Sequence, residues 1–281
     1  MSRARWQIQH RTSYEYFAPA RDSFNDVRLK PLSNARQTVE SFELTTTPSA
    51  PFQQYTDFYA NCVHHFEIPG PHARLVIESR SVVLAHPSPP LSDETTTAPL
   101  AALPGLAKPG DCFEYLGPSR YVDVEPETWR LAIDATDGIT DVWQAVRALM
   151  RFAHGYMDYK PASTHVHTPL REALAQRRGV CQDFAHLTLG LCRSLKIPAR
   201  YVSGYLAVEM ARATHAWVEV WIPTVGWLAL DPTHNRQIDN TYIKIGAGRD
   251  YADVPPVTGS YRGTHEHKME IEVQIDALGP G

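Results

Sequence analysis

The chain has 281 residues, of which 43% are hydrophobic and 21% charged, the ordinary composition of a globular protein with a substantial buried core. Its formal net charge of −4 argues against nucleic acid or an anionic membrane as partner, and no run approaches the ~20 uninterrupted apolar residues of a membrane span. Four scattered cysteines do not form a disulfide framework and the first residues lack the apolar core of a signal peptide, so we expect free thiols and a cytoplasmic location.

Residues 1–90 favour β-strands. Trp6, Ile8, Tyr14 and Tyr16 are spaced by even numbers, as in a strand that buries one face and exposes the other. Further candidate strands are "CVHHFEI" and "RLVIESRSVVLAH", with turn-rich stretches such as "KPLSNAR" and "TTTPSAP" between them. We therefore predict an N-terminal domain over residues 1–90 with a β-sandwich-like or small barrel-like fold.

Residues 86–110 are rich in proline and threonine and lack periodicity, which predicts a surface-packed linker over 91–115. Residues 116–281 begin with helical patterns. These are "PETWRLAIDAT" with Pro126 at its first position, "TDVWQAVRALMRFAHGYMDY" with Thr140 as N-cap, and a third pattern from Val180 or Cys181 to about Leu195. Candidate antiparallel strands follow, namely "ARYVSGYLAVEM", "HAWVEVWI", "GWLALD" and "HKMEIEVQI". Helices followed by antiparallel strands indicate an α+β fold.

Cys181 lies in "RRGVCQDFAHL", where a loop ending near Gly179 meets the start of the third helix. Unpaired N–H groups and the partial positive charge of a helix N-terminus favour a thiolate. The Cys181 N–H would also be free to stabilise an oxyanion. A small buried hydrophobe is the alternative interpretation of Cys181, and it is the one we prefer for Cys192, three turns later among leucines.

A cysteine nucleophile needs a base with an orienting partner, and the predicted hairpin "HAWVEVWIPTVGWLALD" offers both. If Ile222 pairs with Gly226 across the turn, Asp231 falls diagonal to His215 on one face of the two strands. Diagonal neighbours are ~7–8 Å apart, within reach of an imidazole and a carboxylate. The pattern therefore predicts that Asp231 holds His215.

Other histidines offer competing sites. His186 follows Cys181 by five positions on the same helix and points away from it, and His234 is predicted to be a surface residue of a turn. Two His-x-His pairs could bind zinc in principle, at His165 and His167 and at His265 and His267. Neither pair has a spaced third ligand, so we predict no metal.

Taken together, "RRGVCQDFAHLTLGLCRSLKIPARYVSGYL" and "HAWVEVWIPTVGWLALDPTHN" resemble the transglutaminase-like superfamily of papain-related folds. The β-rich first ninety residues and the later stretch "GAGRDYADVPPVTGSYRG" resemble a bacterial subgroup in which an N-terminal β domain precedes the core. The resemblance implies a nucleophile helix packed on an antiparallel sheet. It also implies a catalytic Cys–His–Asp triad formed by Cys181, His215 and Asp231.

Enzymes of this superfamily attack an amide carbonyl with the thiolate and pass through a thioester. The resemblance therefore implies a cysteine protease, an amidase or a transglutaminase-like acyltransferase with a peptide or amide substrate and no cofactor. Gln182, Tyr159 and Trp217 are further candidates for contacting the substrate or oxyanion. For each of them a structural role is the alternative: helix start for Gln182, and core packing for Tyr159 and Trp217.

Three hypotheses remain open. The first is this cysteine hydrolase or acyltransferase, with water or an amine as acceptor. The second is a binding or assembly module with a vestigial triad. The third is a zinc amidase built on the His-x-His pairs, which would lose activity to chelators and keep it after thiol alkylation.

Overall fold

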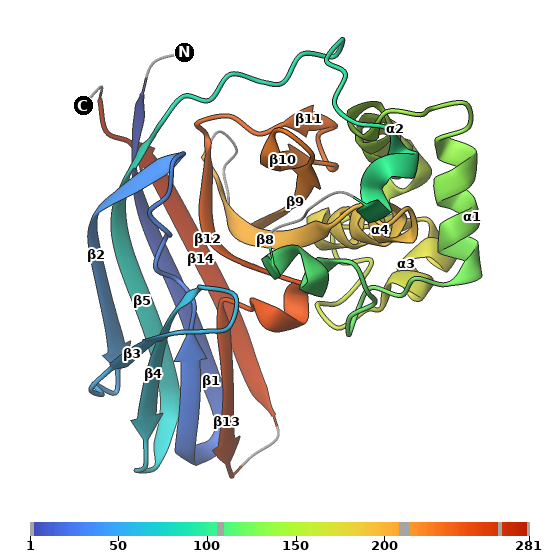
Figure 1. The fold of residues 1–281 in the computed structure, drawn as a ribbon. Coiled ribbons are helices and arrows are strands. Elements are labelled where there is room, and N and C mark those ends of the chain that lie inside the picture. Colours follow the sequence, from blue (N-terminus) through green and yellow to red (C-terminus); the bar gives the residue numbers. More distant parts are fainter. Residues whose placement is uncertain (1–2, 106–109, 208–213, 264–265, 280–281) are drawn as a thin grey trace.

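The computed structural model describes residues 3–105, 110–207, 214–263 and 266–279. In these residues a long antiparallel sheet lies on one side, a smaller antiparallel sheet lies in the middle, and the α-helices gather on the far side (Figure 1). This mixed α and β architecture confirms the predicted fold class. No helix in the described part of the chain is both long and apolar enough to cross a membrane.

The first sheet is organised around its longest strand. Its strands from the N-terminal region are β1 (Ala4–Val27), β2 (Gln37–Thr47), β3 (Gln53–Thr56), β4 (Cys62–Ile68) and β5 (His72–Ala85), in the spatial order β2-β5-β1-β4-β3. The pairing of β1 with β5 is interrupted between Glu15 and Ala20, after which β1 continues beside β4. The β1-β5 and β1-β4 parts enclose one apolar cluster: Tyr16, Ala20, Val27, Leu29, Phe66, Ile68, Leu75 and Ile77. The β-rich N-terminal region expected from the alternating pattern is therefore present as strands of one sheet with a shared apolar cluster.

The C-terminal strands belong to this first sheet. β13 (Val257–Arg262) and β14 (His267–Ala277) both pair antiparallel with β1. Residues 257–277, which the sequence predicts as part of the core at 116–281, therefore pair with a strand of the N-terminal region. Alternation in "HKMEIEVQI" identifies a strand, but it carries no information about which distant strand is the partner.

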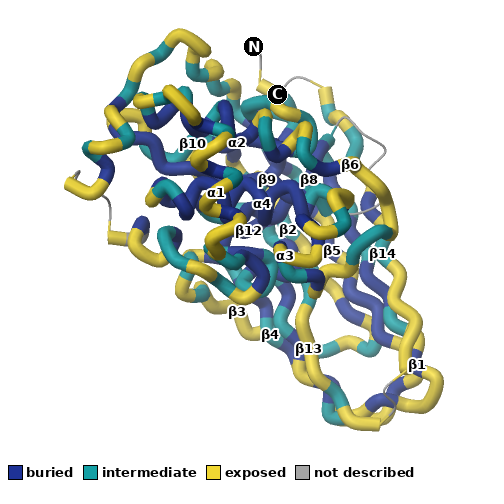
Figure 2. Tube along the Cα trace, turned by 90° about the vertical axis from the view of Figure 1, so that its right-hand side faces the viewer, coloured by how far each residue is buried: buried dark blue, intermediate teal, exposed yellow. Residues whose placement is uncertain are grey.

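The second sheet supports the helices. Its strands are β8 (Ala199–Leu206), β9 (His215–Ile222), β10 (Gly226–Asp231), β11 (Arg236–Gln237) and β12 (Tyr242–Gly248), in the order β11-β10-β9-β8-β12. The last residues of the strand predicted at 199–210 lie outside the described residues. The α-helices are α1 (Pro126–Ala135), α2 (Val142–Tyr156), α3 (Leu170–Gln176) and α4 (Cys181–Ser194), and α4 packs against β8 and β9 with the other three around it. After its first residue, α4 is buried throughout (Figure 2).

Two predicted helix starts have different outcomes. Pro126 is the first residue of α1, as expected. The N-cap of α2 is Asp141 rather than Thr140, because the Asp141 carboxylate accepts a hydrogen bond from the Gln144 N–H at 3.1 Å. Adjacent Asp and Thr residues are both good N-caps, so composition alone did not separate them.

The segment predicted as a linker packs closely onto the second sheet and its helices. It includes the short 3₁₀ helices η1 (Leu100–Gly105) and η2 (Gly110–Tyr115), in which Leu103 and Cys112 are buried. The backbone of Leu91 exchanges two hydrogen bonds with the Gln237 side chain, at 2.8 and 2.7 Å. Several side chains of this segment, Leu103 and Cys112 among them, therefore belong to the core of the helices and the second sheet.

The two sheets share a continuous buried contact. Apolar side chains of both meet in one cluster: Ile8, Val83, Tyr205, Ile243, Ile245 and Val273. The Gln37 side chain accepts from Lys244 N at 2.8 Å and donates to Lys244 O at 2.9 Å, so it pairs with that residue as a strand neighbour would. The first sheet is therefore fastened to β12 of the second.

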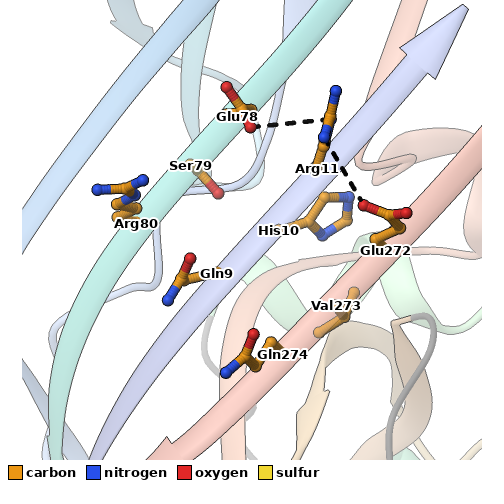
Figure 3. A pocket seen from close by; sticks show the side chains of 9 residues that line it. All are labelled: Gln9, His10, Arg11, Glu78, Ser79, Arg80, Glu272, Val273 and Gln274. Carbon is orange, nitrogen blue, oxygen red and sulfur yellow. Dashed lines mark ion pairs between the residues drawn. The ribbon is translucent and has the colours of Figure 1, made fainter.

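Part of the first sheet presents polar side chains to solvent. Figure 3 shows a hollow on β1, β5 and β14, where Arg11 faces Glu78 at 3.8 Å and Glu272 at 4.0 Å. One polar face is ordinary for an antiparallel sheet whose other face is packed. The Cys181 site lies elsewhere, on the second sheet.

Candidate active site

Cys181 is the first residue of α4, where the sequence places a helix start. The chain approaches it through Gly179, and a Cβ on Gly179 would lie 2.5 Å from the Cβ of Asp183. The Asp183 carboxylate accepts from Val180 N at 2.8 Å and from Thr164 Oγ1 at 2.7 Å. Glycine at 179 and the Asp183 cap thus fix the start of the helix and the position of Cys181.

The β9–β10 hairpin brings His215 and Asp231 together. Ile222 pairs with Gly226, which is the predicted register. The turn is made by residues with positive φ, Thr224 at 69° and Gly226 at 91°. His215 at the start of β9 places Nε2 2.8 Å from Oδ2 of Asp231 at the end of β10.

His215 lies between Asp231 and Cys181. Because Nε2 faces Asp231, Nδ1 is the ring nitrogen left for the Cys181 side chain, which is near enough to affect the pKa of His215. Burial lowers the pKa of His215, but the hydrogen bonds to Asp231 and Cys181 outweigh burial and raise this pKa to about 10. The imidazole is therefore held in its charged form at neutral pH, as a thiolate–imidazolium pair requires.

Asp231 is fully buried and surrounded by donors. Burial raises the pKa of its carboxyl group, but hydrogen bonds from His215, His234 and Tyr242 hold that pKa well below its usual range. Its second oxygen, Oδ1, accepts from Thr233 N at 2.8 Å. Asp231 is thus an anion that can only accept, so His215 Nε2 donates to it.

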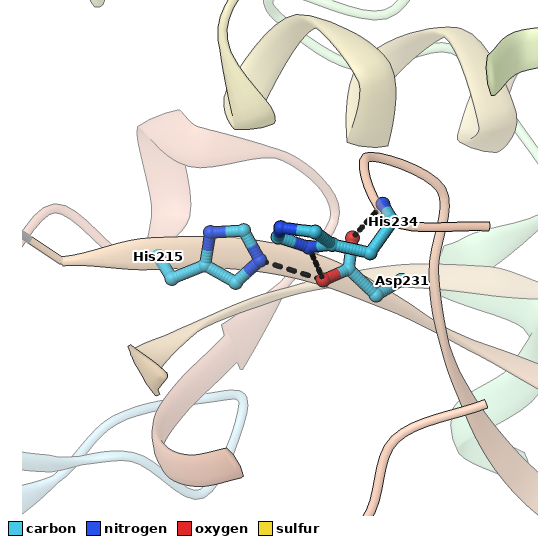
Figure 4. A group of neighbouring side chains, drawn as sticks. All are labelled: His215, Asp231 and His234. Atoms are coloured by element: carbon cyan, nitrogen blue, oxygen red, sulfur yellow. Dashed lines mark hydrogen bonds and ion pairs between the residues drawn. The ribbon is translucent and has the colours of Figure 1, made fainter. Parts of the chain in front are cut away.

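The structure corrects the prediction for His234. Its Nδ1 lies 2.7 Å from Asp231 Oδ2, and its side chain is 30% exposed. Figure 4 shows both imidazoles directed at the same carboxylate. The motif "DPTH" contains a weak signal for this contact, because a histidine three residues after an aspartate in a turn can fold back onto it.

His215, Asp231 and His234 also have the residue types of a metal site, with ligand atoms within 4.8 Å of one another. Their contacts of 2.7 and 2.8 Å are hydrogen-bond lengths. Tetrahedral zinc ligands at 2.0–2.1 Å would be about 3.3 Å apart. The geometry therefore matches a hydrogen-bonded cluster.

The remaining predicted site residues are placed as follows. Gln182 is buried and donates to the Val166 carbonyl at 2.9 Å, so it ties the 160–168 loop to the helix start. Tyr159 is 56% exposed beside Gly179, which makes the core-packing alternative wrong for it. Trp217 is fully buried, and its ring stacks on His215 with a centroid distance of 6.3 Å.

The other histidines do not assemble a second site within the described residues. His165 and His167 lie in an exposed loop, where His167 Nδ1 is 2.7 Å from the Tyr121 hydroxyl. His265 lies outside the described residues. His186 is a buried core residue whose ring stacks on Tyr121, and burial lowers its pKa to about 4.

A helix that begins with cysteine and packs on an antiparallel sheet carrying histidine and aspartate defines the papain-like class of cysteine-dependent enzymes. The sequence pattern of the transglutaminase-like superfamily matches residues 130–232, and that of the bacterial transglutaminase-like N-terminal region matches residues 6–84. The chain belongs to the transglutaminase-like superfamily and has the bacterial N-terminal region.

Three similar proteins illustrate this relationship. An uncharacterized protein of Mycobacterium leprae is 38% identical over 98% of this chain and 99% of its own length. A protein-glutamine gamma-glutamyltransferase of Pseudomonas aeruginosa is 34% identical over 41% of this chain and 20% of that enzyme. The crystal structure of a candidate cysteine protease from Cytophaga hutchinsonii has a TM-score of 0.81 at 23% identity and covers 99% of this chain and 92% of that one. That similarity extends the shared fold to both sheets.

Proposed function

We propose that this protein is a cysteine-dependent enzyme that transfers the acyl group of a peptide or side-chain amide to water or to an amine. The observation that carries the proposal is the pairing of His215 with buried Asp231 at 2.8 Å, close to a cysteine at the start of a buried helix. The superfamily of the chain supports the same chemistry.

In this mechanism the Cys181 thiolate attacks the amide carbonyl carbon, and the C=O electron pair moves onto oxygen. The Cys181 N–H, which has no acceptor inside its own helix, is placed to stabilise that oxyanion. Charged His215 gives a proton to the leaving amine as the C–N bond breaks, which leaves a thioester on Cys181. His215 then takes a proton from water or an amine as that nucleophile attacks the thioester, and the thiolate is released.

Asp231 keeps His215 in the orientation that this cycle needs. By accepting from Nε2 it directs Nδ1 towards Cys181, and its charge stabilises the imidazolium form. Because one relative is a protein-glutamine gamma-glutamyltransferase, glutamine side-chain amides are the first substrates to test.

The first test is the pH dependence of iodoacetamide labelling, followed at each cysteine by mass spectrometry. We expect Cys181 to label rapidly near pH 6, below the ~8.5 of a free thiol, and to lose this advantage in His215→Ala. Cys62 is the internal control because it is also half-buried and has no such partner role. Labelling of Cys181 no faster than Cys62 would contradict the proposal and favour a binding module.

The second test distinguishes water from an amine as the acceptor of the acyl group. Glutamine-containing protein is incubated with a fluorescent primary amine, and both amine incorporation and ammonia release are measured. Incorporation indicates an acyltransferase, whereas ammonia release without incorporation indicates a hydrolase. Neither product from glutamine substrates and no new amino termini from peptide substrates, with a rapidly labelled Cys181, would contradict amide chemistry.

A further inference from the structure

One oxygen of Asp231 collects three side-chain donors. Oδ2 lies 2.8 Å from His215 Nε2, 2.7 Å from His234 Nδ1 and 2.7 Å from the Tyr242 hydroxyl. Only the first of these belongs to the Cys–His–Asp series. Two further side chains, from a turn and from β12, therefore converge on the same atom.

Contacts with Arg236 orient the Tyr242 hydroxyl so that it donates to Asp231. Its hydroxyl accepts from Arg236 Nε at 2.9 Å, and the Arg236 guanidinium lies over the Tyr242 ring at 5.2 Å. Burial and the Asp231 charge raise the pKa of Tyr242 far above its usual range. At neutral pH its hydroxyl therefore keeps its proton and donates it to Asp231.

His234 is fixed by its own turn. Its backbone N–H lies 3.3 Å from Asp231 Oδ1, and its ring centroid is 5.4 Å from that of His215. From α2, His154 Nδ1 lies 3.2 and 3.1 Å from the carbonyl oxygens of Pro232 and Thr233. The turn that carries His234 is thus attached to a helix packed beside α4.

From this convergence we infer that His234 and Tyr242 are positioning residues for the proposed reaction: they hold the Asp231 carboxylate ionised and in one orientation, so that His215 Nδ1 stays directed at Cys181. The inference rests on the proposed function. A buried carboxylate with a single partner would be free to turn about its side-chain bond and would bear a large desolvation cost. The side-chain donors on Oδ2, together with the backbone N–H donors of Thr233 and His234 on Oδ1, remove these two problems.

The arrangement matters most when His215 becomes neutral after giving up its proton. At that moment Asp231 loses its charged partner, and an unsupported buried anion would take a proton itself. Tyr242 and His234 continue to donate to Oδ2, so the carboxylate remains ready to accept from Nε2 in the next step. They act through Asp231 and need no contact with the substrate.

The test uses Tyr242→Phe, which removes one hydroxyl, and His234→Ala, with the Cys181 labelling profile as readout. We expect each variant to shift the midpoint of Cys181 labelling upward by about one pH unit, and to lower the labelling rate near pH 6 about tenfold, as loss of one hydrogen bond to a charged group allows. His234→Asn, which keeps a side-chain donor, should recover part of the loss. Unchanged midpoints in both variants would overturn the inference.

One matched control comes from each sheet, Tyr205 on β8 of the second and His65 on β4 of the first. Tyr205→Phe removes a buried hydroxyl that contacts His10 at 3.0 Å, and His65→Ala removes a half-exposed histidine 2.9 Å from Asp26. Neither should move the Cys181 midpoint, even where thermal unfolding shows a loss of stability. A shift of similar size in the controls would overturn the inference by assigning the effect to general destabilisation.

A double-variant cycle gives the sharpest result. In an Asp231→Asn background, Tyr242→Phe and His234→Ala should cause no further shift, because their effect passes through the carboxylate. A full additional shift would show that they act by another route and would overturn the inference. Slow labelling of Cys181 in the wild type is a different outcome, since it would refute the proposed function itself.

Discussion

Asp183 is the residue that joins the nucleophile to its surroundings. Its buried carboxylate accepts hydrogen bonds from the Val180 N–H and the Thr164 hydroxyl. Its side chain occupies the space left by Gly179. Burial raises the pKa of this carboxyl group, against the effect of these hydrogen bonds. The same side chain therefore secures both the helix start and the loop next to it.

We predict that Asp183→Ala destabilises the protein by about 2 kcal/mol, because a helix cap is lost and two donors are left without their acceptor. The measurement is denaturant unfolding together with Cys181 labelling, which should slow. Asp141→Ala is the matched control, since Asp141 caps α2. It should lower stability and leave labelling unchanged; equal slowing in both variants would contradict a specific role for Asp183.

Among single residues, the sequence predicted Cys181, His215 and Asp231 but not the side chains that donate hydrogen bonds to Asp231. The helix start at Cys181 and the contact of His215 with Asp231 were both predictable, because each depends on short-range spacing within one helix or one hairpin. Tyr242 was missed because its contact with Asp231 crosses from β12 to β10. The alternation of apolar and polar residues in β10 and β12 does not indicate that Tyr242 and Asp231 come into contact.

Among the elements, β8, β9 and β12 are joined by a buried ion cluster. Glu219 of β9 contacts Lys244 Nζ at 2.7 and 2.9 Å and Arg200 Nε at 2.6 Å. Burial raises the pKa of Glu219, but Lys244 and Arg200 outweigh burial and lower this pKa to about 2. The ionised Glu219 thus links three neighbouring strands of the sheet that carries His215.

The lowered pKa of Glu219 makes the stability of the protein depend on pH. The folded pKa of Glu219 is below the unfolded value of about 4.5, so its stabilisation is present above pH ~4.5 and is lost as the pH falls towards 2. We predict that Glu219→Gln lowers the free energy of unfolding by about 3 kcal/mol at pH 7. Measured by denaturant unfolding, the difference from wild type should shrink between pH 4.5 and 2.

The matched control is Glu78→Gln, since Glu78 is exposed and lies 3.8 Å from Arg11. Exposed ion pairs contribute about 0–1 kcal/mol, so this variant should follow the wild type at every pH. A constant difference between wild type and Glu219→Gln down to pH 2 would show that shape, rather than charge, accounts for the loss.

Elements were predictable where their pairing is local. The β9–β10 register followed from a short turn ending in Gly226, which fixes how the two strands align. The β1–β14 pairing joins segments that are distant in the sequence, and many strands of this chain have the same alternation. Composition therefore identified the strands and left their partners undetermined.

At the scale of the whole molecule, β14 is an edge strand of the first sheet, whose other strands come mostly from the N-terminal region. We predict that the amides of β14 that face β1 resist hydrogen exchange as strongly as those of β2, to within about tenfold, because β14 pairs along residues 6–16 and packs Val273 into the contact between the sheets. β2 is the matched comparison, since it is also an edge strand. Rapid exchange throughout β14, as in a frayed terminus, would contradict this prediction.

The order of the strands has a consequence for synthesis on the ribosome. β1 is made first, but β13 and β14 begin about 230 and 240 residues after β1 ends. At translation rates of ~5–20 residues per second, one edge of β1 stays unpaired for on the order of ten to fifty seconds. An open strand edge can pair with a neighbouring nascent chain, so we expect the emerging chain to depend on chaperone protection until β13 and β14 are released.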